Sequence, residues 1–179
     1  MELHQIQVAY QPEEDRILCR ASFRDAGGNL QEVRAWLTRR VVKELWPTML
    51  EAMETQVALD NPRAAHASGD VVEMEHHASV EAFRDGGHFS HSFEGDIRSF
   101  PLGEIPFLVS NADFSIAAGQ PLRMNLMPAS GSGFAITFAQ QVLHGFSSLL
   151  RDAVNNAEWE LELALPGSEH PAPASRTLN

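Results

Sequence analysis

The stretch VRAWLTRRVVKELWPTMLEAM, residues 33–53, changes its hydrophobic period halfway along. Val33, Ala35 and Leu37 alternate with Arg34 and Trp36, as the side chains on the two faces of a β-strand do. After that point the apolar residues fall at helical intervals and form one stripe: Val41, Val42, Leu45, Met49 and Met53. We therefore predict a strand that ends near residue 37 and leads directly into an amphipathic helix, with Thr38 as the N-cap.

A second stretch, FAITFAQQVLHGFSSLLRDAV at residues 134–154, repeats the pattern. A single offset of 101 residues places an apolar residue of this stretch on each of the alternating and stripe residues named above. The polar positions differ, since Arg39 corresponds to Gln140 and Lys43 to His144. The sequence therefore predicts two copies of one supersecondary unit that share a shape but not a surface chemistry.

Shorter alternating runs before each copy predict additional strands. They lie at residues 4–10, 16–24 and 30–37 in the first half, and near 107–109, 113–116, 122–126 and 134–138 in the second. A last alternating run, residues 159–165, predicts a half-buried strand. We predict an α+β fold in which two pseudo-repeats, each of strands followed by a helix, form one antiparallel sheet with both helices packed on one face.

The predicted domain organisation follows from the two copies. Residues 1–165 form a single globular domain, with pseudo-repeats at about 4–55 and 107–155. A histidine-rich insertion at about 56–106 separates them; within it, residues 60–69 resemble a loop and residues 71–83 fit either a strand or a short helix. Residues 166–179 contain three prolines and no apolar period, which predicts a flexible C-terminal tail.

Composition is that of an ordinary folded protein, with 179 residues, 44% hydrophobic content and a formal net charge of −11. No apolar run approaches the length of a transmembrane span, and the start MELHQIQVAY lacks the features of a signal peptide. We therefore expect a cytoplasmic protein without a membrane partner. The one cysteine, Cys19, lies in a predicted strand and is expected to be a buried structural thiol.

The acidic net charge argues against a broad nucleic-acid-binding surface, yet residues 16–43 carry seven of the thirteen basic residues. Arginine and aromatic side chains on one sheet face, with cations at the helix start, suit single-stranded nucleic acid. An ordinary solvated sheet face or a dimer surface has the same composition. The candidate binding residues are Arg20, Arg24, Arg34, Trp36, Arg39 and Arg40.

Five of the eight histidines lie in the middle segment, with Glu73, Glu75, Glu81 and Asp85 nearby in sequence. Imidazole and carboxylate groups are ordinary ligands of zinc and iron. The spacing matches no compact metal-binding motif, and no cysteine accompanies the histidines. Solvated loop histidines are therefore the alternative to a metal site, whose candidate ligands are His76, His77, His88 and His91.

No nucleophile elbow, dinucleotide-binding fingerprint or phosphate-binding loop is present, so we expect a protein that is not an enzyme and needs no cofactor. The leading hypothesis is a non-enzymatic interaction or assembly protein that acts through protein–protein contacts, with itself as a homodimer or with another protein. The alternatives are single-stranded nucleic-acid binding through the arginine surface and metal binding through the histidines.

The order of several antiparallel strands followed by a helix, twice over, is similar in outline to the PUR and Whirly group of single-stranded nucleic-acid binders. This resemblance covers topology only, and no binding motif of those families can be placed on a residue here. The run HQIQV…EDRILCR…RAWLTRRVVKELWP also resembles an uncharacterised bacterial family, a resemblance that implies no function.

Overall fold

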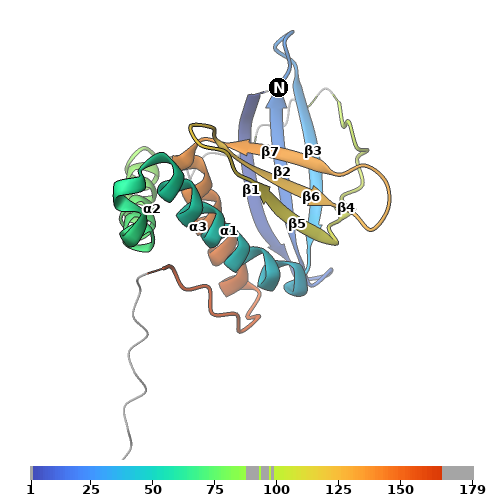
Figure 1. Cartoon of the computed structure of the whole chain (residues 1–179). Helices are drawn as coiled ribbons and strands as arrows, with labels where there is room; N and C mark the ends of the chain where they lie inside the picture. The colour runs from blue at the N-terminus through green and yellow to red at the C-terminus, as the bar shows by residue number, and fades with distance from the viewer. Residues whose placement is uncertain (1, 88–92, 94–96, 98, 167–179) are drawn as a thin grey trace, which may run out of the picture.

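The computed structural model describes residues 2–87, 93, 97 and 99–166 (Figure 1). This part of the chain has an α+β fold, as the sequence predicts. The elements in chain order are β1 (Glu2–Gln11), β2 (Arg16–Arg24), β3 (Leu30–Leu37), α1 (Arg39–Asp60), the 3₁₀ helix η1 (Pro62–Ala67), α2 (Ser68–Asp85), β4 (Phe107–Leu108), β5 (Asn111–Ser115), β6 (Leu122–Met127), β7 (Phe134–Phe138) and α3 (Gln140–Asn156).

The strands form two sheets where the sequence predicts one. The first has the order β1-β2-β3-β4 and the second the order β5-β6-β7. All pairs are antiparallel except that of β4, which joins β3 in parallel. The division occurs just after β4, where the backbone amide of Ser110 donates to the carbonyl of Met127 at 2.8 Å. That bond directs the chain away from the first sheet and into a three-stranded sheet of its own.

The repeat in the sequence is matched by the elements. β3 and β7 end at Leu37 and Phe138, and α1 and α3 begin at the following equivalent positions. Equivalent apolar residues are buried in both helices, for example Leu45 and Phe146. Thr38 is the N-cap, as predicted, and its hydroxyl accepts a hydrogen bond from the amide of Val41 at 3.3 Å.

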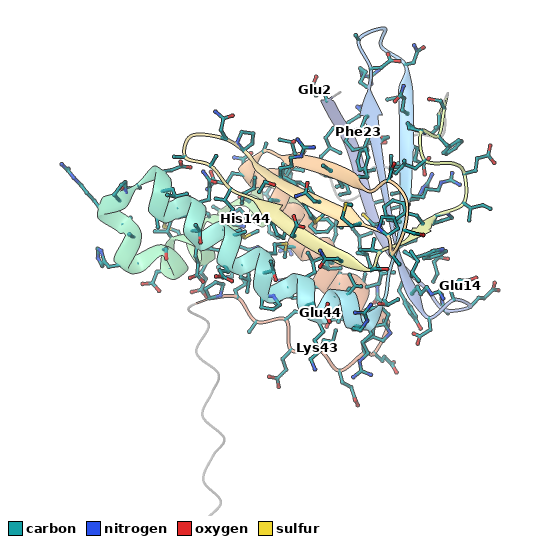
Figure 2. All side chains as sticks on the ribbon, turned by 45° about the vertical axis from the view of Figure 1, so that its right-hand side comes forward. Glu2, Glu14, Phe23, Lys43, Glu44 and His144 are labelled. Carbon is teal, nitrogen blue, oxygen red and sulfur yellow. The ribbon has the colours of Figure 1, made fainter. Side chains whose placement is uncertain are left out.

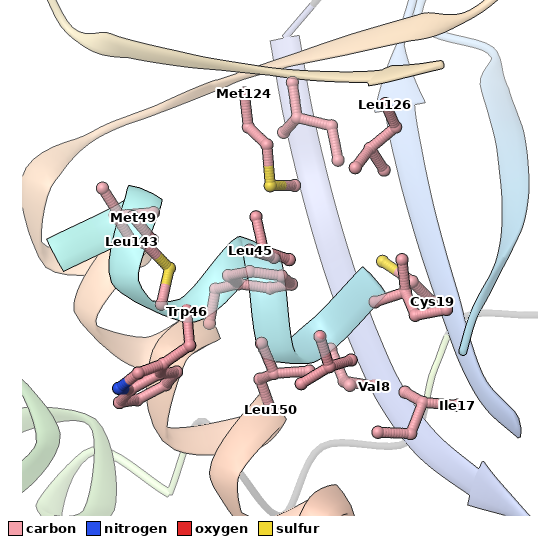
Figure 3. Packing of buried hydrophobic residues seen from close by; sticks show 14 of the residues in the cluster. Val8, Ile17, Cys19, Leu45, Trp46, Met49, Met124, Leu126, Leu143 and Leu150 are labelled. Atoms are coloured by element: carbon pink, nitrogen blue, oxygen red, sulfur yellow. The ribbon is translucent and has the colours of Figure 1, made fainter. Parts of the chain in front are cut away.

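The helices are exchanged between the two halves. Helix α1 lies along β5 of the second sheet, and helix α3 lies along β1 of the first. Side chains from both sheets and both helices meet in one hydrophobic core (Figure 3). The inner faces of the sheets also meet directly, because the rings of Phe23 and Phe134 pack edge to face with centroids 4.9 Å apart. Neither half therefore has a core of its own.

Much of the middle segment is helical. The predicted loop at residues 60–69 is the end of α1, the 3₁₀ helix and the start of α2. The ambiguous residues 71–83 belong to α2, which packs against both α1 and α3. Most of residues 88–98 and, apart from Pro166, the predicted tail at 166–179 lie outside the described residues.

The predicted strand at residues 159–165 is wrong, because this segment pairs with no strand of the described chain. Its alternation is nevertheless real, since Trp159, Leu163 and Leu165 are buried in the core. The indole of Trp46 on α1 donates to the carbonyl of Ala164 at 2.9 Å, and the indole of Trp159 donates to Asp15 at 2.9 Å. Apolar side chains and these two bonds hold the segment without a sheet.

Candidate functional site

Two of the predicted binding residues, Arg20 and Arg34, lie side by side on the outer face of the first sheet, because β2 and β3 pair them directly. Both form ion pairs with Glu32, whose side chain is 0% exposed. The Nε atom of each guanidinium lies 2.7 Å from the same carboxylate oxygen, Oε1. Arg20 stacks over Phe93, with 4.0 Å from guanidinium to ring centre, and Arg34 over Phe100 at 4.6 Å.

Glu32 changes what this surface can bind. Burial works to raise the pKa of its carboxyl, but the hydrogen bonds from Arg20 and Arg34 outweigh burial and leave the pKa below its usual value. The carboxylate is therefore ionised at neutral pH and offsets part of the arginine charge. On this outer face Arg20 and Arg34 are therefore paired with a carboxylate of the chain itself, whereas the sequence suggested free cations.

The other predicted binding residues are scattered. Arg24 lies at the far end of β2, where it donates to the carbonyl of Gly28 at 3.2 Å. Trp36 is half-buried on β3. Arg39 and Arg40 are exposed at the start of α1, at the opposite end of the sheet, and Arg40 faces Glu44 at 3.7 Å. The structure therefore brings Arg20 and Arg34 together and does not gather the six residues into one basic patch.

The predicted metal ligands also separate. His76 is buried against α3, whereas His77 is exposed and faces Glu73 at 3.8 Å. His88 and His91 lie outside the described residues. Within residues 2–87 and 99–166 no group of three or more potential ligand side chains gathers closely enough to hold a metal ion.

A cavity of about 400 Å³ lies where α2 covers the end of α1 and the start of α3, and sequence reasoning did not anticipate it. Its apolar lining comes from both halves of the chain. Its polar lining is contributed mainly by the three helices. The lining residues are Met53, Gln56, Val57, Asp60, Asn61, Val71, Glu75, Gly119, Gln120, Pro121, Leu122, Phe138, Gln140, Leu143 and His144.

One polar side of the cavity is built around Asp60 at the end of α1. Its carboxylate accepts hydrogen bonds from the amide of Gln56 and from the backbone N–H of Gly119, both at 2.7 Å. These bonds hold the pKa of Asp60 below its usual value, so the carboxylate is ionised. Gln56 also donates to the carbonyl of Ala117 at 3.2 Å, while its own side-chain oxygen is buried without a hydrogen-bond partner.

The other polar side is formed by Glu75 of α2 and His144 of α3, which lies near the junction of the helices (Figure 2). Burial raises the pKa of Glu75, against a hydrogen bond from Gln140 that lowers it. Burial lowers the pKa of His144 to about 4, so its ring is neutral at pH 7. The 3.8 Å between His144 Nε2 and the Glu75 carboxylate is therefore a polar contact and not an ion pair.

A second buried histidine, His76, packs against the ring of His144. The rings of His76 and His144 are 5.7 Å apart, and His76 Nδ1 lies 3.3 Å from the hydroxyl of Ser147. That hydroxyl donates to the backbone carbonyl of His144 at 2.8 Å. Burial lowers the pKa of His76 to about 4, with contributions from His144 and Arg151. Both imidazoles are therefore neutral under ordinary conditions.

The cavity combines an apolar floor with two carboxylates and a neutral imidazole, and an amide oxygen without a partner is buried in its wall. One sequence signal pointed toward it. The repeat offset replaces Lys43 of the first helix by His144 and Arg39 by Gln140, so the charged start of the first copy becomes neutral in the second. Glu75, Asp60 and the enclosing position of α2 depend on tertiary packing that no local pattern encodes.

No protein-family model, curated protein or solved structure matches this chain. None of the helices in its described part is long and apolar enough to cross a membrane. The geometry of the chain itself must therefore carry any functional proposal.

Proposed function

We propose that this protein is a non-enzymatic binding protein whose ligand is a small organic molecule held in the cavity between α1, α2 and α3. The observation that carries the proposal is the cavity itself. Its volume of about 400 Å³ lies in the range of small-molecule sites, and its apolar lining carries a few convergent polar groups. Titratable groups with displaced pKa values, here Glu75 and His144, are a further mark of functional sites.

The nearby nucleophilic groups favour binding over covalent catalysis. The hydroxyl of Ser147 is fully buried, donates to a backbone carbonyl and does not line the cavity. Cys19 lies in the core, where burial raises its pKa to about 12, so it carries no thiolate at neutral pH.

A fragment screen by two-dimensional NMR tests the proposal. We expect bound fragments to shift the amide signals of residues 56–61, 71–75 and 140–144. Val57→Phe, which fills the cavity, should abolish binding, whereas Leu59→Phe, two residues along the same helix at an exposed position, should not. If no fragment binds at about 1 mM, a concentration that detects affinities near −4 kcal/mol, the cavity is not a ligand site.

Self-assembly is a second candidate function, favoured by the edge of the first sheet. β4 pairs on one side only within the described sheet. The apolar side chains of Leu108 in β4 and of Ile105 just before it are 44% and 85% exposed. Exposed apolar residues at an open edge fit a contact with a second copy of the chain. Sedimentation should then show a dimer that Ile105→Lys dissociates and Leu59→Lys, at another exposed apolar position, leaves intact.

Single-stranded nucleic-acid binding stays a prediction with less support. The charges of Arg20 and Arg34 are shared with Glu32, and Arg39 and Arg40 lie at a distant corner. Titration of single-stranded DNA and RNA at low and moderate salt, with an Arg39→Ala, Arg40→Ala variant, remains the direct test.

A further inference from the structure

We propose that the ligand of the cavity is an organic cation, an amine or a guanidine attached to an apolar body. This inference rests on the proposed function and names the chemical class that the site selects. It follows from four properties of the lining: its charge, its unpaired hydrogen-bond acceptors, its position at a helix end, and its apolar floor.

The first property is an uncompensated negative charge. Among the described residues that line the cavity, Asp60 and Glu75 are acidic and none is Lys or Arg. His144 does not supply the missing positive charge, because it is neutral at pH 7. In a protein of formal net charge −11, an anionic ligand would meet repulsion both inside and outside the site, whereas a cation would be attracted.

The second property is a surplus of acceptors. The side-chain oxygen of Gln56 is buried in the cavity wall without a partner, while the side-chain nitrogen donates to Asp60 and to the carbonyl of Ala117. His144 is 2% exposed, and its Nδ1 is likewise buried in the wall without a partner, so either atom could accept a bond from a ligand only after its side chain turns toward the cavity. Each carboxylate oxygen of Asp60 accepts one bond and can accept another. Ammonium and guanidinium groups offer several N–H donors and no acceptor, which is the complement of this set.

The third property is the position of Asp60, Gln56 and Asn61 at the C-terminal end of α1. Carbonyl groups at this end of a helix carry partial negative charge and are stabilised by a nearby cation. The last turn of α1 contains no basic residue, so the chain does not provide that cation itself. A bound organic cation would supply this positive charge at the C-terminal end of α1.

The start of α3 also faces the cavity and would by itself favour an anion. No side chain caps this helix, and Gln140 lies in its first turn. The carboxylate of Glu75 already lies at this position, where it accepts a hydrogen bond from the side chain of Gln140. Glu75 therefore already places a carboxylate beside the start of α3, and it adds negative charge to the site.

The fourth property is the apolar floor, which requires a ligand with a hydrocarbon part. Met53, Val57 and Val71 line it from α1 and α2, and Leu122 and Phe138 from the second sheet. A metal ion would leave this surface uncovered, and in the described part of the chain no set of three ligand side chains is close enough to hold one. An alkyl or aryl group would bury it.

Three probes of nearly equal shape and different charge test the inference: phenethylamine, its neutral isostere 2-phenylethanol, and the anion 3-phenylpropanoate. Each is titrated into the full chain at about pH 8, where alkylammonium groups remain protonated because they titrate near pH 10. We expect phenethylamine to shift the cavity amides and to bind about 10-fold more tightly than the alcohol, since charge-assisted hydrogen bonds are the stronger kind. The anion should not bind.

Two near-isosteric variants and one matched control assign the effect. Asp60→Asn and Glu75→Gln should each weaken phenethylamine binding about 10-fold and leave 2-phenylethanol binding unchanged. Asp70→Asn, an exposed position on α2 that does not line the cavity, should change neither. Thermal unfolding of each variant shows whether its fold is intact before affinities are compared.

The outcomes separate this inference from the proposed function. If the alcohol binds as well as the amine, or if only neutral fragments enter the cavity, the cation inference is wrong and the cavity remains a ligand site. The same holds if both variants bind the amine normally. If no probe and no fragment binds, both proposals fail.

Discussion

Helices α1 and α3 occupy equivalent places in the two halves, but their polar faces differ. Their apolar positions match, and in both helices these residues pack in the common core, where all but the partly buried Val142 are buried. Their polar positions diverge, because Lys43 on α1 is exposed while its equivalent His144 on α3 is enclosed with α2 and lines a cavity. The comparison teaches that the apolar pattern maintains the fold, and that the remaining positions are free to build a site in one copy only.

The largest expected effect tests whether the two helices are equivalent in the core. Leu45 and Phe146 occupy equivalent, fully buried positions. Leu45→Ala and Phe146→Ala should each lower the free energy of unfolding by about 3–4 kcal/mol, because apolar burial is lost and a cavity is left. Urea denaturation followed by both fluorescence and circular dichroism should show a single transition for each. Two transitions would mean that the halves unfold separately, contrary to the exchanged helices.

The next effect concerns a position where the two halves differ completely. Glu32 is buried between two arginines, and its equivalent in the second half is Gly133. Glu32→Gln should lower the free energy of unfolding by about 3 kcal/mol, because it leaves adjacent arginines without their counter-charge.

Gly133→Ala should also destabilise the fold, because an added Cβ would meet the backbone carbonyl of Leu126 and the sulfur of Met127. Chemical denaturation measures both changes, with Glu51→Gln at an exposed position of α1 as the control. An effect of Glu32→Gln no larger than the control would show that the network is only a surface ion pair.

A third effect is a pH dependence of stability, which buried His144 should cause and exposed Lys43, its equivalent, should not. The pKa values of His76 and His144 are lowered to about 4, so the unfolded chain, with pKa values near 6.5, binds more protons between these limits. The contribution of each neutral histidine to the free energy of unfolding is therefore largely present at pH 7. It is lost as the pH falls through 6.5, by about 2 kcal/mol per histidine between about pH 7 and pH 5. The raised pKa of Glu75 acts in the opposite direction and offsets part of this loss.

Denaturation at a series of pH values checks this prediction. A His144→Gln variant should show a flatter dependence on pH even if it is less stable throughout. A wild-type stability that is constant from pH 7 to pH 5 would contradict the neutral, buried state of both rings.

The smallest effect compares the two helix starts. Thr38 caps α1, whereas Ala139 stands at the equivalent position of α3 and offers no capping side chain. Thr38→Ala should cost about 1 kcal/mol, and Ala139→Ser should gain about 0.5 kcal/mol by supplying the missing cap. Thermal unfolding of the two single variants is sufficient. An Ala139→Ser variant that is less stable than wild type would show that the start of α3 is constrained by its neighbours.

Local sequence patterns predicted most of the fold for a physical reason. The alternation of Val33, Ala35 and Leu37, and the helical spacing after Thr38, are properties of neighbouring residues, and they survive in the structure. The separate second sheet and the unpaired segment at 159–165 could not be predicted in the same way. Strand pairing depends on which edges meet in space, and an alternating run such as that around Trp159 can be buried by helices and loops instead.

The candidate site was predicted only in fragments. Pairing of β2 with β3 makes Arg20 and Arg34 neighbours, as the alternation implied, but the position of Glu32 between them depends on side-chain geometry. The cavity was missed because it needs α2, whose residues 71–83 fit a strand as well as a helix. Its polar groups Asp60, Glu75 and His144 come from three different helices, so no sequence spacing links them.

The exchange of helices between the halves also sets the order in which the protein can fold. During synthesis β1, β2, β3 and α1 leave the ribosome first, while β5, which α1 covers, and α3, which covers β1, have not yet been made. The apolar stripe of α1, with Leu45 and Met49, therefore cannot be covered by the second sheet until β5 has been made. Closing contacts over such long separations in sequence slows folding and leaves apolar surface open to aggregation. A newly made first half thus exposes apolar surface, and β1 is covered only when α3 has followed the second sheet.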